Sequence, residues 1–193
     1  MRLSSGMLVG ALGLAFAALA ASDAATVGAL PPGGAASPAH AVWREVKWPF
    51  LLDEWGIGRA FRCARADCGT EVNLYLRAKI GFCNCATGVS DDNDLDRVGD
   101  LGLFSDAFVG LAEGRPVGVG RLAGRIRPYH VTIPYAPARD VLAIGFNDQC
   151  DVAVATVVAE ADRLAAAGQL ALDFLGADLV QRWAAAELGR NGI

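Results

Sequence analysis

Apolar and polar residues alternate strictly over positions 71–82, which is the clearest pattern in the chain. The apolar positions are Val72, Leu74, Leu76, Ala78, Ile80 and Phe82. A period of two indicates a β-strand with one buried face. Phe61 and Cys63 alternate with polar neighbours just before this segment, and the loop between them contains Asp67 and Gly69. We therefore expect an antiparallel hairpin.

Four later segments also have the composition of strands, at positions 116–123, 125–133, 141–146 and 152–158. The first two are the weaker pair, and we place the turn between them at Gly124. The last two predict a hairpin that turns through Asn147, Asp148 and Gln149.

The period changes in the last part of the chain, where positions 162–175 and 177–188 carry apolar residues at helical spacings. These residues are Leu164, Leu170, Phe174, Leu175, Leu179, Val180, Trp183 and Leu188. Gly176 separates the two predicted helices, and Gly189 ends the second. Strands followed by helices predict an α+β domain in which C-terminal helices cover an antiparallel β-sheet.

The N-terminal segment, positions 1–25, has the layout of a cleavable export signal: Arg2, an apolar run and then small residues. The run is rich in Ala and Gly and falls short of the about 20 strongly apolar residues of a membrane-spanning helix. Positions 26–41 are rich in Pro, Gly and Ala, which predicts a flexible spacer. We therefore expect a periplasmic or secreted protein, without a membrane span after cleavage, whose single domain covers positions 42–193.

Three of the four tryptophans, Trp43, Trp48 and Trp55, lie close together around Pro49. Because proline interrupts a regular helix, we expect an apolar strap over the core. Large rings this close in sequence are more often core than ligand site. Where they are exposed, however, they form an interaction face.

The chain contains five cysteines, Cys63, Cys68, Cys83, Cys85 and Cys150. The spacing of the first four resembles a metal knuckle, but a continuous strand over 71–82 would place the two pairs about 35 Å apart. In an exported protein we expect disulfides. Cys63 then pairs with Cys68, and Cys150 pairs with Cys83 or Cys85. The cysteine left over predicts a disulfide-linked dimer or a reactive thiol.

A second hypothesis assigns chemistry to Cys83 and Cys85, with Cys150 nearby. These cysteines could exchange disulfides or hold Cu(I) between two thiolates. Against this hypothesis, the chain has no C-x-x-C motif at a helix N-terminus, which is the usual means of lowering a thiol pKa.

A third hypothesis concerns the acidic residues Asp91, Asp92, Asp94 and Asp96, whose oxygens could bind a divalent cation such as Ca²⁺. The segment lacks the glycine and the final glutamate of an EF-hand loop. The alternative is a helix start, with Ser90 as its N-cap and acidic residues in the first turn.

Charge and motif content exclude several function classes. The formal net charge is −4 and no basic run is present, so nucleic acid is not an expected partner. Of the two histidines only His130 lies in the folded domain, and nucleophile-elbow and phosphate-loop motifs are absent from the sequence. A nucleophile at Cys150, with His130 as base and Asp148 or Asp151 as orienting group, has no support from spacing. We therefore favour a non-catalytic protein over an enzyme.

Our first hypothesis is a disulfide-stabilised binding or accessory module in the cell envelope. Its partner would be an envelope protein or a small ligand. The expected interaction face combines the tryptophan strap at 43–55 with the loop at 83–100.

Overall fold

The computed structural model describes residues 41–81 and 84–188. All of them belong to one compact unit, Ala36–Ile193. The expected export signal, the spacer up to residue 40 and Cys83 lie outside the described residues.

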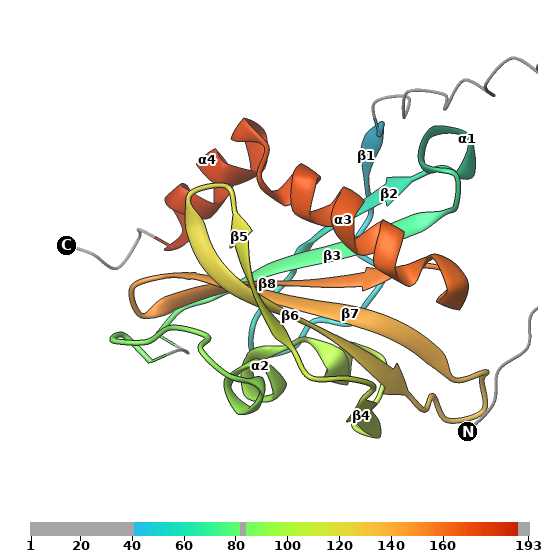
Figure 1. Ribbon diagram of the computed structural model, residues 1–193, viewed down its shortest axis with the longest axis horizontal. Coiled ribbons are helices and arrows are strands. Elements are labelled where there is room, and N and C mark those ends of the chain that lie inside the picture. Colours follow the sequence, from blue (N-terminus) through green and yellow to red (C-terminus); the bar gives the residue numbers. More distant parts are fainter. Residues whose placement is uncertain (1–40, 82–83, 189–193) are drawn as a thin grey trace, which may run out of the picture. The chain divides into compact units, whose positions relative to one another are not determined.

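The described chain forms an eight-stranded antiparallel sheet in the order β1-β2-β3-β8-β7-β6-β4, in which β5 also pairs with β6 (Figure 1). The strands are β1 (Trp43–Val46), β2 (Arg59–Cys63), β3 (Val72–Lys79), β4 (Phe108–Gly110), β5 (Arg115–Val119), β6 (Leu122–Val131), β7 (Arg139–Asp148) and β8 (Asp151–Val158). The helices are α1 (Arg65–Cys68), α2 (Asp92–Val98), α3 (Leu164–Leu175) and α4 (Asp178–Leu188), with 3₁₀ turns η1 (Leu101–Leu103) and η2 (Ala161–Arg163).

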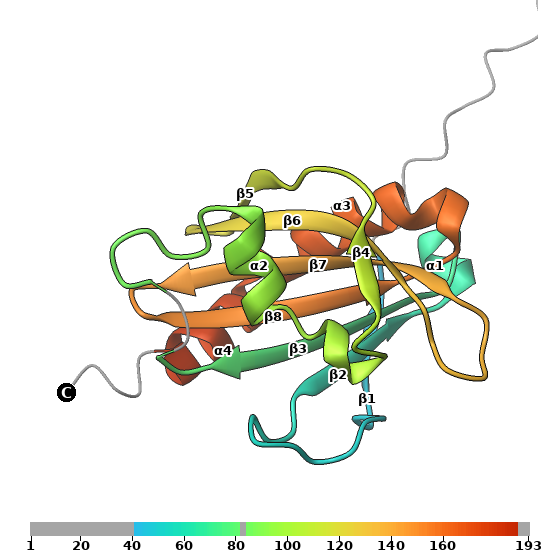
Figure 2. The ribbon, with the colours of Figure 1, turned by 90° about the horizontal axis from the view of Figure 1, so that it is seen from below.

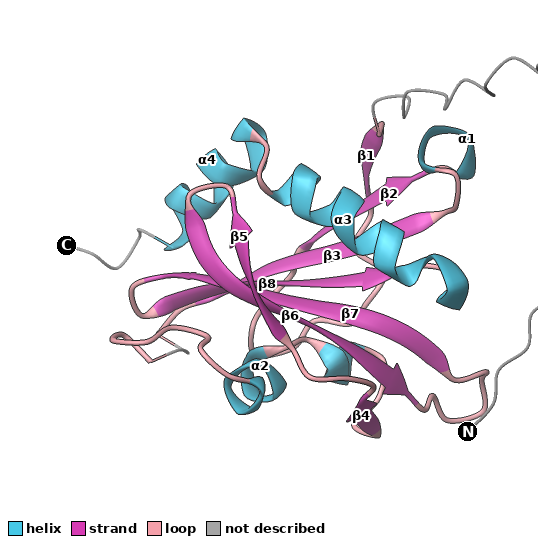
Figure 3. Ribbon diagram, viewed as in Figure 1, coloured by secondary structure: helices cyan, strands magenta, loops and turns pink. Residues whose placement is uncertain are grey.

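Helices cover the sheet from both sides. Helices α3 and α4 lie across one face (Figure 3), whereas α2 lies on the other (Figure 2). On the α3/α4 face, Leu74 and Leu76 of β3 belong to the main core. On the α2 face, Leu95 and Val98 belong to a second core with Tyr129 of β6. The predicted α+β class, with an antiparallel sheet, C-terminal helices and disulfides, is confirmed.

Strand β8 shows why some strands lack alternation in sequence. All eight of its residues are buried. It lies in the middle of the sheet between β3 and β7, and both of its faces are covered. A strand buried on both faces has no polar side to alternate with, so between Val152 and Val158 the sequence is apolar except for Thr156.

The expected turn at Gly124 is wrong, because the hairpin turns at Gly120 and Arg121. Gly120 has a φ of +59°, which a tight two-residue hairpin turn requires at its first position. Gly124 lies inside β6 instead. A Cβ there would lie 2.4 Å from the carbonyl oxygen of Gly145 on β7, so close strand approach explains this glycine.

Two disulfides fix opposite ends of β3. Cys63–Cys68 closes the loop that contains α1, just before β3. Cys85–Cys150 joins the segment after β3 to the β7–β8 turn. The strand itself is shorter than the predicted 71–82, because it ends at Lys79 and the backbone turns at Gly81, with a φ of +66°.

Within the described ranges, no helix combines the length and apolar character needed to cross a membrane.

Candidate functional site

The first four residues of the expected tryptophan strap form the edge strand β1, and residues 47–58, here called the strap, follow it. Trp48 is buried and meets Phe50 and Tyr75 edge-on, at ring distances of 5.2 Å and 6.1 Å. Trp43 instead stacks on Phe174 of α3, at 4.8 Å. The tryptophans therefore serve different parts of the core and do not form one aromatic face.

A buried group of charges holds the strap against β3. Arg77 donates to both carboxylate oxygens of Asp100, at 2.9 Å and 2.7 Å. It also donates to Asp53 of the strap, at 2.6 Å, and to the carbonyl oxygen of Gly56, at 3.1 Å. Lys79 contacts Asp100 at 2.8 Å. The side chains of Arg77, Lys79 and Asp100 are all buried, and the hydrogen bond from Arg77 lowers the pKa of Asp53.

The tip of the strap exposes large apolar side chains. Leu51 is 90% exposed, Leu52 is 72% exposed and Ile57 is 70% exposed. Trp55, between them, lies against the ammonium group of Lys79, 5.2 Å from its ring centre. The carboxylate of Asp53 is thus directed to the buried Arg77, whereas the neighbouring aliphatic side chains face solvent. Sequence reasoning named the tryptophans and missed the leucines. One sequence feature could have indicated the position of the strap. Arg77 and Lys79 on β3 require acidic partners, and Asp53 of the strap is one of them.

The acidic residues at 91–96 dock α2 onto the sheet. The N-cap is Asp91, whose carboxylate accepts from the backbone N–H of Asp94 at 2.8 Å, so the expected cap at Ser90 is wrong by one residue. The Ser90 hydroxyl donates to Asp94, at 2.9 Å. Asp92 accepts from Arg125 of β6 at 2.6 Å.

A second contact of the same kind lies one helical turn further on. Asp96 accepts from Arg127 at 3.0 Å and also from the hydroxyl of Tyr129. The backbone N–H of Gly114 donates to Asp92 and lowers its pKa. In residues 41–81 and 84–188, no group of three His, Cys, Asp or Glu side chains is arranged to hold a metal ion. The carboxylates on α2 have protein partners instead.

The cysteine positions bear on the thiol and nucleophile hypotheses. Cys85 and Cys150 share a disulfide, so neither offers a thiolate in this form. For the same reason, the hypothetical Cys150 nucleophile has no free thiol in this form. His130 Nδ1 lies 2.7 Å from Asp140 of β7, and neither Asp148 nor Asp151 is the partner of its ring in the described structure.

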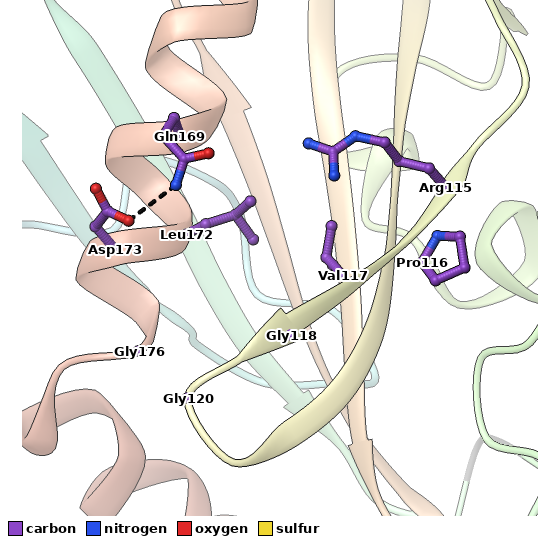
Figure 4. Close-up of a pocket in the computed structure, with 9 residues that line it drawn as sticks. All are labelled: Arg115, Pro116, Val117, Gly118, Gly120, Gln169, Leu172, Asp173 and Gly176. Atoms are coloured by element: carbon purple, nitrogen blue, oxygen red, sulfur yellow. Dashed lines mark hydrogen bonds between the residues drawn. The ribbon is translucent and has the colours of Figure 1, made fainter.

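Two hollows are present on the described surface. One, of about 610 Å³, lies at the end of the sheet where β8 leaves for η2, and the His130–Asp140 pair lines it. The other, of about 580 Å³, is a groove between β5 and α3 (Figure 4). Two ion pairs join residues that line the first hollow, Arg65 with Glu160 and His130 with Asp140.

Comparison with protein-family models and with curated protein sequences finds no match to this chain. Its function must therefore be argued from its own surface.

Proposed function

We propose that this protein is a non-catalytic binding module of an extracytoplasmic compartment, with the strap tip, residues 51–57, as its contact surface. The observation that supports this proposal is the exposure of large aliphatic side chains on an anchored strap. Leu51, Leu52 and Ile57 face solvent while Asp53 is turned inward to Arg77.

Exposed apolar side chains on an anchored loop suit recognition for an energetic reason. Burying one leucine or isoleucine against a partner contributes about 1.5–3 kcal/mol. A mobile loop would lose part of this gain in ordering its backbone. The strap is held by two hydrogen bonds from Arg77, to Asp53 and to Gly56, and by the contact of Trp55 with Lys79. Its side chains are therefore presented at a low entropic cost.

The charge around the tip favours a protein partner. Glu54, which is exposed, lies two positions after Leu52, and the chain has a formal net charge of −4. Anionic lipid headgroups and nucleic-acid phosphates would be repelled by these charges. An apolar pocket on another protein would bury the leucines without that penalty.

The two disulfides support the proposed extracytoplasmic location. Disulfides persist in oxidising compartments and are rare in the cytosol of most cells. We expect the protein to be recovered from the periplasm or the medium, with an intact mass equal to that of the chain without its export signal. Recovery of the unprocessed chain from the cytosol, with five free thiols, would contradict this part of the proposal.

The strap can be tested by photo-crosslinking in an extract of the envelope. A benzoylphenylalanine in place of Leu52 should give one discrete protein adduct, whereas the same group in place of Leu179, 56% exposed on α4, should not. Excess unlabelled wild-type protein should suppress the adduct, and a Leu51→Ser/Leu52→Ser variant should not. Equal competition by both proteins would refute the strap as the contact surface. Co-flotation with phosphatidylcholine vesicles that depends on the two leucines would instead indicate a membrane.

A further inference from the structure

The second surface of interest is the groove between β5 and α3, on the sheet face opposite the strap. Three residues of α3 and its C-cap residue line one wall, at relative positions i, i+3, i+4 and i+7: Gln169, Leu172, Asp173 and Gly176. Strand β5 forms the other wall. Figure 4 shows Leu172 pointing towards Val117 in the middle of the groove, and Arg115 and Gln169 on opposite sides of one end.

Strand β5 has a free edge along this groove. In the described chain it pairs only with β6, through a register that begins at Val119↔Leu122. A two-residue turn closes on a hydrogen-bonded pair, and such pairs alternate along an antiparallel ladder. The ladder bonds therefore use Arg115, Val117 and Val119.

The backbone groups of Pro116 and Gly118 consequently face away from β6. Proline at position 116 fits this register, because its missing N–H is not needed in the ladder. The edge then offers a carbonyl oxygen at Pro116 and both an N–H and a carbonyl oxygen at Gly118. A Cβ added at Gly118 would meet no atom within 4 Å, so the space beside it is open.

The two sheet edges differ in how they are protected. Strand β1, at the other edge, carries exposed Arg44 and Glu45, and charged side chains on an edge oppose pairing with another chain. Residues 117–119 of β5 are Val, Gly and Val. Arg115 and Pro116 at the start of β5 are themselves edge-protecting residues, so the part of this edge that is open to an added strand is residues 117–119.

The groove is formed before any ligand arrives. Gln181 of α4 donates to the carbonyl oxygens of Val119, at 3.2 Å, and Leu175, at 2.9 Å, which joins the hairpin to the end of α3. A Cβ at Gly176 would lie 3.2 Å from the backbone nitrogen of Gly120, so the hairpin turn and the helix end approach closely. Strand and helix are therefore held at a fixed separation.

We propose that this groove binds an extended peptide, which adds a strand antiparallel to β5 and places an acidic group at Arg115. Backbone pairing at a sheet edge supplies affinity, and alternate side chains supply specificity. The residue opposite Gly118 exchanges two hydrogen bonds with it, and an apolar side chain fits between Val117 and Leu172.

The charges in the groove set the preferred sequence. Arg115 makes no hydrogen bond or ion pair with the described part of the chain. Asp173, the other charged group in the wall, accepts from Gln169 at 2.9 Å. A carboxylate, from an acidic side chain or a peptide C-terminus, is the complement that Arg115 lacks.

Selection from a display library of random heptapeptides on the full, oxidised chain tests this proposal. Selected peptides should share an apolar residue and an acidic residue two positions apart, because Val117 and Arg115 lie on the same face of β5. Gly118→Pro, which removes the outward N–H, should raise the Kd at least about tenfold, and the matched control Gly118→Ala should stay within about twofold. Arg115→Glu should replace the acidic preference by a basic one.

Three results would overturn the proposal. These are the absence of enriched peptides, unchanged affinity in Gly118→Pro, and a dimer of this chain that Gly118→Pro disrupts while peptides do not bind. If Gly118→Pro fails to fold, the test is instead the rate of hydrogen exchange at the Gly118 amide of the wild-type protein, measured with and without peptide. Protection on peptide addition supports the added strand, and exchange that stays unchanged while the strap amides respond refutes it.

Discussion

Asp100 is the residue on which the buried charges of the strap anchor depend most. Its two oxygens contact Arg77 at 2.9 Å and 2.7 Å, and Lys79 at 2.8 Å. Asp100→Asn keeps the shape of the side chain and removes its charge. Two buried cations then remain next to Asp53, the carboxylate of the strap, which is one-third exposed.

The expected loss of stability is large for one substitution. Removing one partner from a buried ion pair costs about 3–5 kcal/mol, because the remaining charge stays desolvated. A domain of this size has about 5–15 kcal/mol in total. We therefore expect Asp100→Asn to lower the free energy of unfolding by about 3–5 kcal/mol and the Tm by about 10 °C.

Urea unfolding followed by tryptophan fluorescence measures this loss. Asp106→Asn, on an exposed aspartate, is the matched control and should cost less than about 0.5 kcal/mol. Combining Asp100→Asn with Arg77→Met removes one charge of each sign, so the double variant should cost at least about 1.5 kcal/mol less than the two single losses together. A loss in Asp100→Asn below about 1 kcal/mol, or strict additivity in the double variant, would refute the reasoning.

Other predictions concern a buried hydroxyl, the disulfides and acid. Thr156→Val should raise the free energy of unfolding by about 1 kcal/mol in urea, because its buried hydroxyl has no partner among the described residues; destabilisation would contradict this. Replacing both cysteines of Cys85–Cys150 by serine should lower the free energy of unfolding by about 4 kcal/mol, and the same change at Cys63–Cys68 should lower it by about 2 kcal/mol. The difference arises because Cys85–Cys150 closes the longer loop. Equal losses would argue against the loop-entropy explanation. The folded pKa of Asp53 is lowered, so its contribution is complete above the unfolded pKa, about 4, and disappears as the pH falls further. Asp53→Asn should therefore flatten the fall in Tm between about pH 5 and pH 2, and an unchanged slope would contradict this.

Periodicity in the sequence predicts the elements that have one buried face or a helical stripe. The alternation at 71–82 corresponds to β3, and the change of period after residue 160 corresponds to α3 and α4. Strand β1 was missed because four residues next to a proline-containing segment carry too short a pattern.

The candidate site was harder to predict because its contacts are distant in sequence. Arg77 and Lys79 lie on the polar face of β3, and alternation alone does not distinguish a solvated polar face from one covered by counter-charges. Asp53 comes 24 positions earlier and Asp100 comes 23 positions later. The free edge of β5 was hidden for a related reason, since it depends on register and not on composition.

The position of β8 in the sheet also determines how the protein must fold. Strand β3 pairs with β8 along seven residue pairs, of which the closest in sequence, Lys79↔Val152, spans 152 − 79 = 73 positions. The first three strands therefore join the rest of the sheet only when β3 pairs with β8, which comes much later in the sequence. Closing so long a loop slows folding. The Cys85–Cys150 disulfide, once formed, holds both ends of that loop together, so oxidised chains should refold faster than reduced ones after dilution from denaturant.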